Sequence, residues 1–171
     1  MAGIYKLPGS SYEELVKIIK AYSFGKSGIA VSLGELVQVT GMAKTIISRN
    51  NGFLVQIKLI SEGKKKAPTD LCKKMGEAYE SNRNEEVQNY WNQIIANDEF
   101  LTRMLSAIQI KEKMSKTEFI NHIVSSSNAG NNGASRAGAT AIIEIFKMLA
   151  LVEEKDGNLV IGMEKKNIVV E

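Results

Sequence analysis

The stretch from Leu33 to Leu71 constrains the fold more than any other part of this sequence. Apolar residues recur there at helical spacing up to Val37, and Thr40-Gly41 ends the pattern as a helix C-terminus would. A second apolar periodicity runs through residues 42–60, and Ser61-Glu62-Gly63 is typical of a turn. Three consecutive lysines follow: Lys64, Lys65 and Lys66. This order predicts helix, turn, helix and a hairpin with a basic tip, which is a winged helix-turn-helix.

The flanking segments are expected to complete this first module. Ser10 and Glu13 have the spacing of a capping box, so we expect a helix that begins there and ends near Ser23. Residues 29–31 are apolar and are expected to form a small first strand, followed by helices over about 32–39 and 42–58. The strands of the basic hairpin are expected at residues 58–60 and 67–69.

A second helix, helix, hairpin series is expected near the C-terminus, about 90 residues after the first. Ser115 and Glu118 form a capping-box pattern for a helix to about residue 125, and a polar, flexible loop is expected over 126–133. A strongly apolar helix should span about 134–150. Asp156-Gly157 between two apolar runs is a strong signal for a tight hairpin turn.

The predicted fold class is therefore mainly α with small β-hairpins (α+β), built from two winged helix-turn-helix modules joined by bridging helices. The expected modules are residues 1–75 and 111–171, with residues 76–110 as the bridge. Helices are expected over about 70–79, 85–96 and 99–108. Trp91 is interpreted as a core or inter-module packing residue rather than a platform for base stacking.

Composition excludes several classes of protein. Cys72 is the single cysteine and His122 the single histidine, so a Cys/His zinc site and a catalytic constellation of the usual residues are not expected. No metal or other cofactor is predicted, and the chain is not expected to be an enzyme. No apolar run reaches the roughly 20 residues of a membrane span, so the protein is expected to be soluble, cytoplasmic and free of membrane contact. Cys72 lies beside Lys73 and Lys74, and either a reactive thiol of lowered pKa or a buried inert thiol is compatible with that position.

Charge is distributed unevenly along the chain. Residues 1–75 hold 12 Lys and Arg against 5 Asp and Glu, whereas residues 76–171 hold 10 against 14, so a polyanion should meet the N-terminal half. The polar face of the 42–58 helix, on which Gln56 is also expected, offers side chains suited to bases and phosphates. The candidate nucleic-acid-binding residues are Lys44, Thr45, Ser48, Arg49, Asn51, Lys58, Lys64, Lys65 and Lys66. Alternatively, these residues form a solvated helix face and a hairpin tip whose lysines protect an edge strand.

The second module differs in charge. Its hairpin carries acidic residues where the first carries lysines: Glu153, Glu154 and Asp156. Phosphate binding by this hairpin would be electrostatically unfavourable. We therefore expect the second module to pack, to dimerise or to bind protein, although its Asn-rich loop could still reach a nucleic-acid backbone.

Several short motifs belong together: Leu59-Ile60 at a helix end, the basic hairpin with Pro68-Thr69 and Leu71, the run Gly-Ala-Ser-Arg-Ala-Gly-Ala-Thr at 133–140, and Phe-Lys-Met-Leu-Ala at 146–150. In these motifs the chain resembles an uncharacterised prokaryotic family of tandem winged-helix proteins. The resemblance covers about Ser10 to Ile161 and implies two winged-helix modules in a bacterium or archaeon. It implies no catalytic residue and no particular ligand. The long Asn/Ser loop before residue 133 departs from the family pattern.

These patterns predict a protein that binds double-stranded DNA, most simply a transcriptional regulator acting as a homodimer on two half-sites. The alternative is a protein–protein interaction scaffold of tandem winged helices without DNA binding. Salt distinguishes them, because DNA binding weakens steeply as salt rises and an apolar interface does not.

Overall fold

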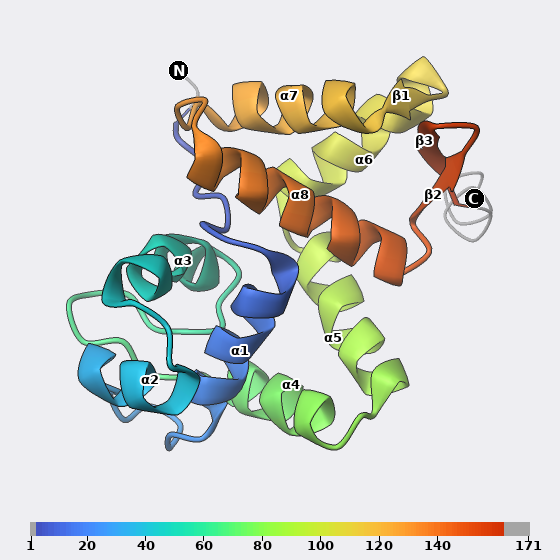
Figure 1. Ribbon diagram of the computed structural model, residues 1–171. Coiled ribbons are helices and arrows are strands. Elements are labelled where there is room, and N and C mark those ends of the chain that lie inside the picture. The colour runs from blue at the N-terminus through green and yellow to red at the C-terminus, as the bar shows by residue number, and fades with distance from the viewer. Residues whose placement is uncertain (1–2, 163–171) are drawn as a thin grey trace.

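The computed structural model describes residues 3–162. Within that range the chain forms eight helices and a small three-stranded antiparallel sheet near the C-terminus (Figure 1). The helices are α1 (Tyr12–Ser23), α2 (Leu33–Thr40), α3 (Lys44–Gln56), α4 (Asp70–Glu80), α5 (Asn84–Ala96), α6 (Glu99–Lys111), α7 (Lys116–Ser127) and α8 (Gly133–Met148). The strands are β1 (Met114–Ser115), β2 (Val152–Lys155) and β3 (Asn158–Ile161). Among the described helices, none combines the length and apolar character needed to span a bilayer.

Helix α1 begins one residue later than the sequence predicts. Its capping box consists of Ser11 and Glu14, because the Ser11 side chain accepts from the Glu14 amide and the Glu14 carboxylate accepts in return. The expected pair of Ser10 and Glu13 is wrong. Ser10 is buried instead, where its hydroxyl accepts a hydrogen bond from the Asn50 side chain at 2.9 Å.

The segment between α3 and α4 forms an open hairpin, here called the lysine hairpin (residues 60–68). The expected strands at 58–60 and 67–69 are reduced to one antiparallel bridge between Ile60 and Pro68. Proline has no N–H for a longer ladder, and Lys58 has a left-handed φ of 64° that takes it out of the strand region. The expected strand at 29–31 is likewise absent from the sheet, but the Val31 amide donates to the Lys66 carbonyl at 2.8 Å.

The C-terminal part is more regular. Strand β3 lies between β1 and β2, and the β2–β3 turn has Asp156 and Gly157 at φ values of 52° and 79°, as a type I′ hairpin turn requires. The predicted Asp-Gly hairpin is therefore confirmed, whereas β1 was not predicted. The expected loop over 126–133 is shorter, since α7 continues to Ser127 and Asn132 already caps α8.

Helices α3 and α8 end in the same way. After each helix one residue, Lys58 or Ala150, takes a left-handed φ of 64° or 56°. The next amide, that of Leu59 or Leu151, donates at 2.9 Å to a carbonyl oxygen in the last helical turn. This is the Schellman ending, and at both sites it directs the chain into a hairpin. The left-handed position usually belongs to glycine, so both positions are conformationally strained.

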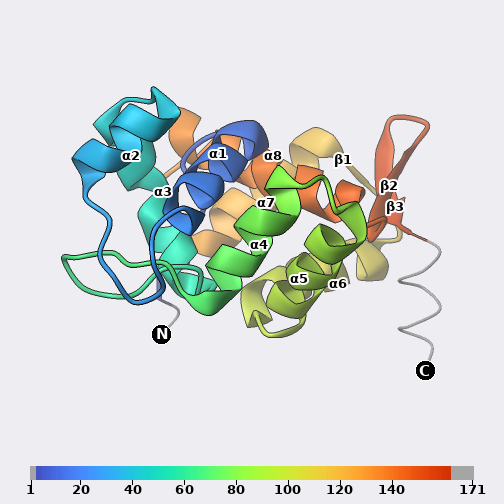
Figure 2. The same ribbon diagram turned by 90° about the horizontal axis from the view of Figure 1, so that it is seen from below.

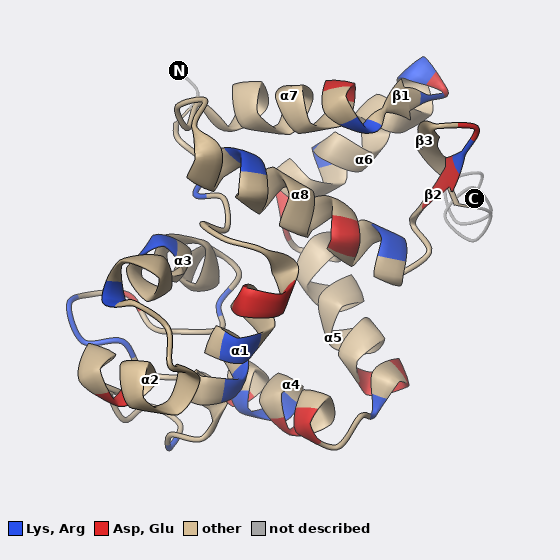
Figure 3. Ribbon diagram, viewed as in Figure 1, with Lys and Arg blue, Asp and Glu red and all other residues tan. Residues whose placement is uncertain are grey.

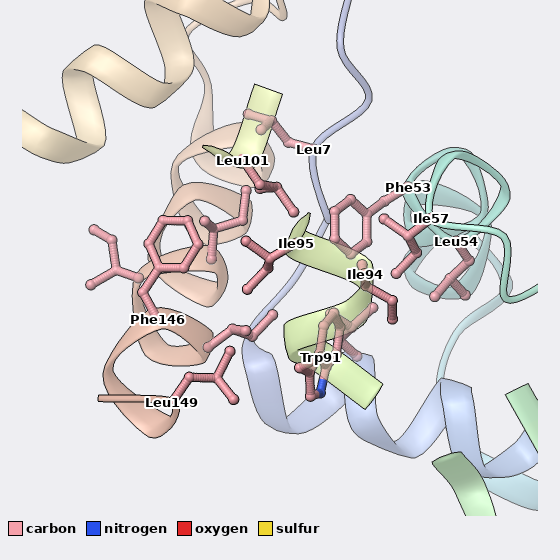
Figure 4. Close-up of a cluster of buried hydrophobic side chains, with 14 of the residues drawn as sticks. Leu7, Phe53, Leu54, Ile57, Trp91, Ile94, Ile95, Leu101, Phe146 and Leu149 are labelled. Carbon is pink, nitrogen blue, oxygen red and sulfur yellow. The ribbon is translucent and has the colours of Figure 1, made fainter. Parts of the chain in front are cut away.

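Helix α5 supplies the centre of the hydrophobic core (Figure 4). Trp91, Ile94 and Ile95 of α5 lie between side chains of α3 and side chains of α8, so one continuous core joins the two ends of the molecule. Trp91 is fully buried, and its Nε1 donates to the Tyr79 hydroxyl at 2.7 Å, which confirms its predicted packing role. The expected boundary at residue 75 falls inside α4, and α6 packs against β3.

An extended N-terminal segment (residues 3–10) lies between the N-terminal and C-terminal helices. The Tyr5 amide donates to the Ser127 carbonyl at 2.9 Å. The Tyr5 ring stacks on the Phe100 ring with their centroids 4.0 Å apart. At Gly138 of α8 a Cβ would overlap the carbonyl oxygen of Pro8. Glycine at this position therefore lets the segment pass close to α8.

Candidate nucleic-acid interface

A groove lies between α2, α3 and the lysine hairpin. It has a volume of about 450 Å³ and is lined in part by α3 residues Ser48 and Asn51 and by the lysines of the hairpin. The structure thus brings together five of the nine predicted site residues: Ser48, Asn51, Lys64, Lys65 and Lys66. The hydrogen bond between Val31 and Lys66 holds the hairpin beside α2, which closes the groove on that side.

The inner wall of the groove positions Asn51. Burial raises the pKa of Tyr22 to about 12, so its hydroxyl is protonated at neutral pH. That hydroxyl donates to Asn51 Oδ1 at 2.8 Å. Asn51 is half-buried, and no residue among 3–162 accepts a hydrogen bond from its Nδ2. The amide nitrogen is thus available as a donor at the inner end of the groove.

The hairpin lysines give the groove its charge. Lys64 and Lys65 are exposed and Lys66 is half-buried. Within residues 3–162, none of the three forms an ion pair. Glu35 of α2 also lines the groove, where its carboxylate accepts from the Ser32 hydroxyl at 3.2 Å. The groove is consequently net positive, with hydroxyl and amide groups beside the charge.

The outer face of α3 carries the next group of predicted residues. Lys44, Thr45, Ser48 and Arg49 are all exposed, and the buried face of the helix carries Ile47, Asn50, Phe53 and Leu54. Arg49 lines a second hollow of about 350 Å³ together with Lys6. Lys44 and Thr45 lie in the first turn of α3, and Lys58 is exposed beyond its end; these three line neither hollow.

Two polar residues of α3 have structural contacts. Gln56, expected on the outward face, is half-buried and exchanges two hydrogen bonds of 2.7 Å with the backbone of Lys6. Asn50 is fully buried and accepts from the Gly9 amide at 2.8 Å. Both residues attach the N-terminal segment to α3. The expectation for Gln56 is therefore wrong, because the backbone of Lys6 occupies both polar atoms of its amide.

Sequence reasoning missed Lys6 as a member of this surface. Its side chain lies over Gly52, where a Cβ would be 3.1 Å from Lys6 Cγ. The mid-helix glycine was the available signal, since it indicated either a kink or a close approach. The close approach is made by Lys6, which adds a cation beside Arg49.

The remaining reactive residues do not form a site. Cys72 is fully buried, and burial raises the pKa of its thiol to about 12, which fits the inert alternative. Burial and the nearby Lys111 and Arg103 lower the pKa of His122. Among residues 3–162, no group of three or more His, Cys, Asp or Glu side chains could hold a metal ion.

Basic residues mark α3 and the segment that follows it, whereas acidic residues mark the β2–β3 hairpin (Figure 3). The fold and this surface together define a mainly helical protein with a basic groove. No protein-family model, curated protein or solved structure matches the chain.

Proposed function

We propose that this chain binds double-stranded DNA through α3 and the lysine hairpin, and that it acts as a transcriptional regulator. The observation that carries the proposal is the groove, in which three lysines without ion-pair partners among residues 3–162 lie beside Ser48 and Asn51 of a helix. In this arrangement the lysines would contact phosphates, and the exposed face of α3 would lie in the major groove. Binding as a homodimer to two half-sites is part of the proposal.

The repetition of elements supports a tandem winged-helix interpretation. The first unit, residues 12–69, contains α1, the segment 28–31, α2, α3 and the lysine hairpin. The second unit, residues 99–161, contains α6, β1, α7, α8 and the β2–β3 hairpin in the same order. In both units the segment before the second helix pairs with the returning side of the hairpin, through Val31 and Lys66 in one and through Met114 and Leu159 in the other.

A mobility-shift titration on random duplex DNA at about 50 and 200 mM salt tests the proposal. It compares the wild-type chain with Lys64→Ala/Lys65→Ala/Lys66→Ala. If the lysines contact three phosphates, the triple variant binds more weakly and its slope of log K against log salt is shallower by up to about 3.

The matched control removes three exposed lysines from the second unit: Lys111→Ala/Lys113→Ala/Lys155→Ala. It has the same net charge as the test variant, so it should bind nearly as the wild type does. Equal weakening by both variants would indicate attraction by net charge alone. Absence of binding by the wild-type chain at the lower salt concentration would overturn the proposal.

A protein-interaction scaffold is the second candidate, and one surface feature favours it. Phe24 and Val39 are 62% and 56% exposed, and both line a shallow hollow at the ends of α1 and α2. Exposed apolar side chains that adjoin one another are typical of protein contacts. Pull-down with Phe24→Ser/Val39→Ser as the comparison would support this candidate if capture of a partner is lost and duplex binding is retained.

A further inference from the structure

The second hollow of the molecule is lined by both units. On one side lie Lys6 and the α3 residues Ser48 and Arg49, and on the other lie Asn132 and Ala134 at the start of α8. The N-terminal segment holds the two sides together, since it is bonded to α3 through Asn50 and Gln56 and to the end of α7 through Ser127. The exposed face of α3 therefore continues directly into the turn between α7 and α8.

The first turn of α8, which follows directly, carries a positioned arginine. Arg136 Nη1 donates to Asn121 Oδ1 at 2.8 Å and to Asn131 Oδ1 at 3.4 Å. Both acceptors are neutral amides, and within the part of the chain that the structure describes Arg136 forms no ion pair. The guanidinium group is thus restrained in position while its charge stays uncompensated. An arginine in this state is suited to phosphate oxygens, because its other N–H groups are pre-arranged to donate.

The acidic residues of the β2–β3 hairpin lie at the other end of α8. Arg136 is the fourth of the 16 residues of α8, so about 18 Å of helix separates it from the end nearest the β2–β3 hairpin. That length exceeds the Debye length of about 10 Å at 0.1 M salt, so the hairpin carboxylates are largely screened from a ligand at Arg136. Glu144 lies on α8 between Arg136 and the hairpin, and its Oε1 is 4.0 Å from Lys116 Nζ, which offsets its charge. The negative charge of the β2–β3 hairpin therefore does not prevent an anionic ligand from binding at Arg136.

We propose that the α7–α8 turn and the first turn of α8, through Arg136 and its supporting asparagines, bind the phosphate backbone of the same duplex that α3 contacts. This inference rests on the proposed function and extends it: the second unit contributes to the DNA site through the start of α8 rather than through its hairpin. The hollow between Arg49 and Asn132 is where the duplex would pass from one unit to the other.

Fluorescence anisotropy with a labelled duplex, titrated at several salt concentrations, tests the inference with Arg136→Ala. Loss of one phosphate contact should weaken binding about 3- to 10-fold and make the slope of log K against log salt shallower by about 1. Arg136→Lys keeps the charge, so it should keep the salt slope and recover part of the affinity. Lys155→Ala removes one exposed charge from the acidic hairpin and should bind as the wild type does.

The outcomes separate this inference from the proposed function. If the hairpin lysine variant binds weakly while Arg136→Ala binds as tightly as the wild type, the α7–α8 turn is not a contact and the proposed function stands. If the wild-type chain binds no duplex, both fail. A thermal melt of Arg136→Ala accompanies the titration. If Arg136→Ala melts as the wild type does and its salt slope is shallower, the inference is supported. If Arg136→Ala is unstable, Arg136→Lys is the test: retention of the wild-type salt slope with partly recovered affinity supports the inference, and affinity equal to that of the wild type overturns it.

Discussion

The two units of this protein share their order of elements and differ in the charge of their hairpins. In each unit the last long helix ends in a Schellman motif and leads into a hairpin, at Lys58 in one and at Ala150 in the other. The first hairpin then carries Lys64, Lys65 and Lys66, and the second carries Glu153, Glu154 and Asp156. The two hairpins thus share the backbone geometry of the preceding helix end but differ in the sign of their surface charge. The same local backbone path can therefore present opposite charges, so the function of each hairpin depends on its side chains.

The hairpins also lie at opposite ends of the molecule. In Figures 1 and 2 the segment between α3 and α4 projects on the side of α2, and the β2–β3 hairpin projects on the opposite side. The N-terminal segment and α5 connect the two ends through one core. A ligand bound along α3 would therefore meet the start of α8 before it met the acidic hairpin. This arrangement allows an acidic hairpin and the proposed basic binding surface to coexist in one chain.

The largest expected effect comes from reversing the charge of the first hairpin. Lys64→Glu/Lys65→Glu/Lys66→Glu should weaken duplex binding by about 100-fold or more at 0.1 M salt, because it would remove the three proposed phosphate contacts and add repulsion. The reciprocal variant Glu153→Lys/Glu154→Lys/Asp156→Lys should change affinity by less than about threefold, since that hairpin lies beyond the screening distance. Anisotropy titrations measure both. Comparable effects of opposite sign would mean that net charge, and not a located surface, determines binding.

A pair of glycine substitutions distinguishes how the two long helices hold the N-terminal segment. Gly138→Ala would place a methyl group against the carbonyl oxygen of Pro8. Because this oxygen belongs to the backbone, it cannot shift as easily as a side chain, and the free energy of unfolding should fall by about 2 kcal/mol. Gly52→Ala meets only the flexible side chain of Lys6, at 3.1 Å from its Cγ. There the gain in helix propensity, up to about 1 kcal/mol, should offset the contact.

Chemical denaturation of both variants measures these differences, and the m-value shows whether the folded state stays compact. Equal destabilisation by the two substitutions would mean that the N-terminal segment is held alike by α3 and α8. Little change at Gly138 would mean that residues 3–10 can leave the gap between the helices at small cost.

The sequence was sufficient to predict features that depend on neighbouring residues. Each helix was expected within a few residues of its observed position, and the Asp156-Gly157 turn was expected because few residues other than Asn, Asp and Gly tolerate two left-handed positions in succession. The burial of Trp91 also followed from its place on an apolar stripe. The run of lysines at 64–66 was visible without any structure.

Features that depend on distant residues could not be predicted. Of two adjacent serines, Ser11 caps α1 and Ser10 is buried, because Asn50 approaches the buried serine from another helix. Gln56 was expected on the outward face of its helix, but the backbone of Lys6, which is 50 residues away in the sequence, hydrogen-bonds to its side chain. For the same reason Arg49 could not be connected with Asn132, since the two line one hollow only because of how the N-terminal segment packs.

The two Schellman endings allow stability to be separated from binding. Lys58→Gly and Ala150→Gly each replace a strained left-handed residue with one that adopts this conformation freely, so each should raise the free energy of unfolding by about 0.5–1 kcal/mol. Only Lys58→Gly removes a charge from the proposed DNA surface, and it alone should weaken duplex binding, by a few-fold. Lys58→Ala is the control that loses the charge and keeps the strain. If Lys58→Gly binds DNA as the wild type does, Lys58 lies outside the contact surface.

The smallest expected effect concerns the ion pair that holds the second hairpin to α8. Lys147 Nζ lies 2.8 Å from Glu154 Oε1, and the hydrogen bond from Lys147 lowers the pKa of the Glu154 carboxyl below its ordinary 4.5. A lowered folded-state pKa stabilises the protein above pH 4.5, and this contribution is lost as the pH falls through the lower value. The pair is exposed, so Glu154→Gln should lower the melting temperature only slightly at pH 7 and low salt. The difference from the wild type should disappear once the pH has fallen below the lowered pKa of Glu154, and also in high salt. Lys65→Gln in the first hairpin, where residues 3–162 offer no such pair, should show no comparable pH-dependent difference. A difference that persists in acid would mean that Glu154 stabilises its hairpin by packing rather than by charge.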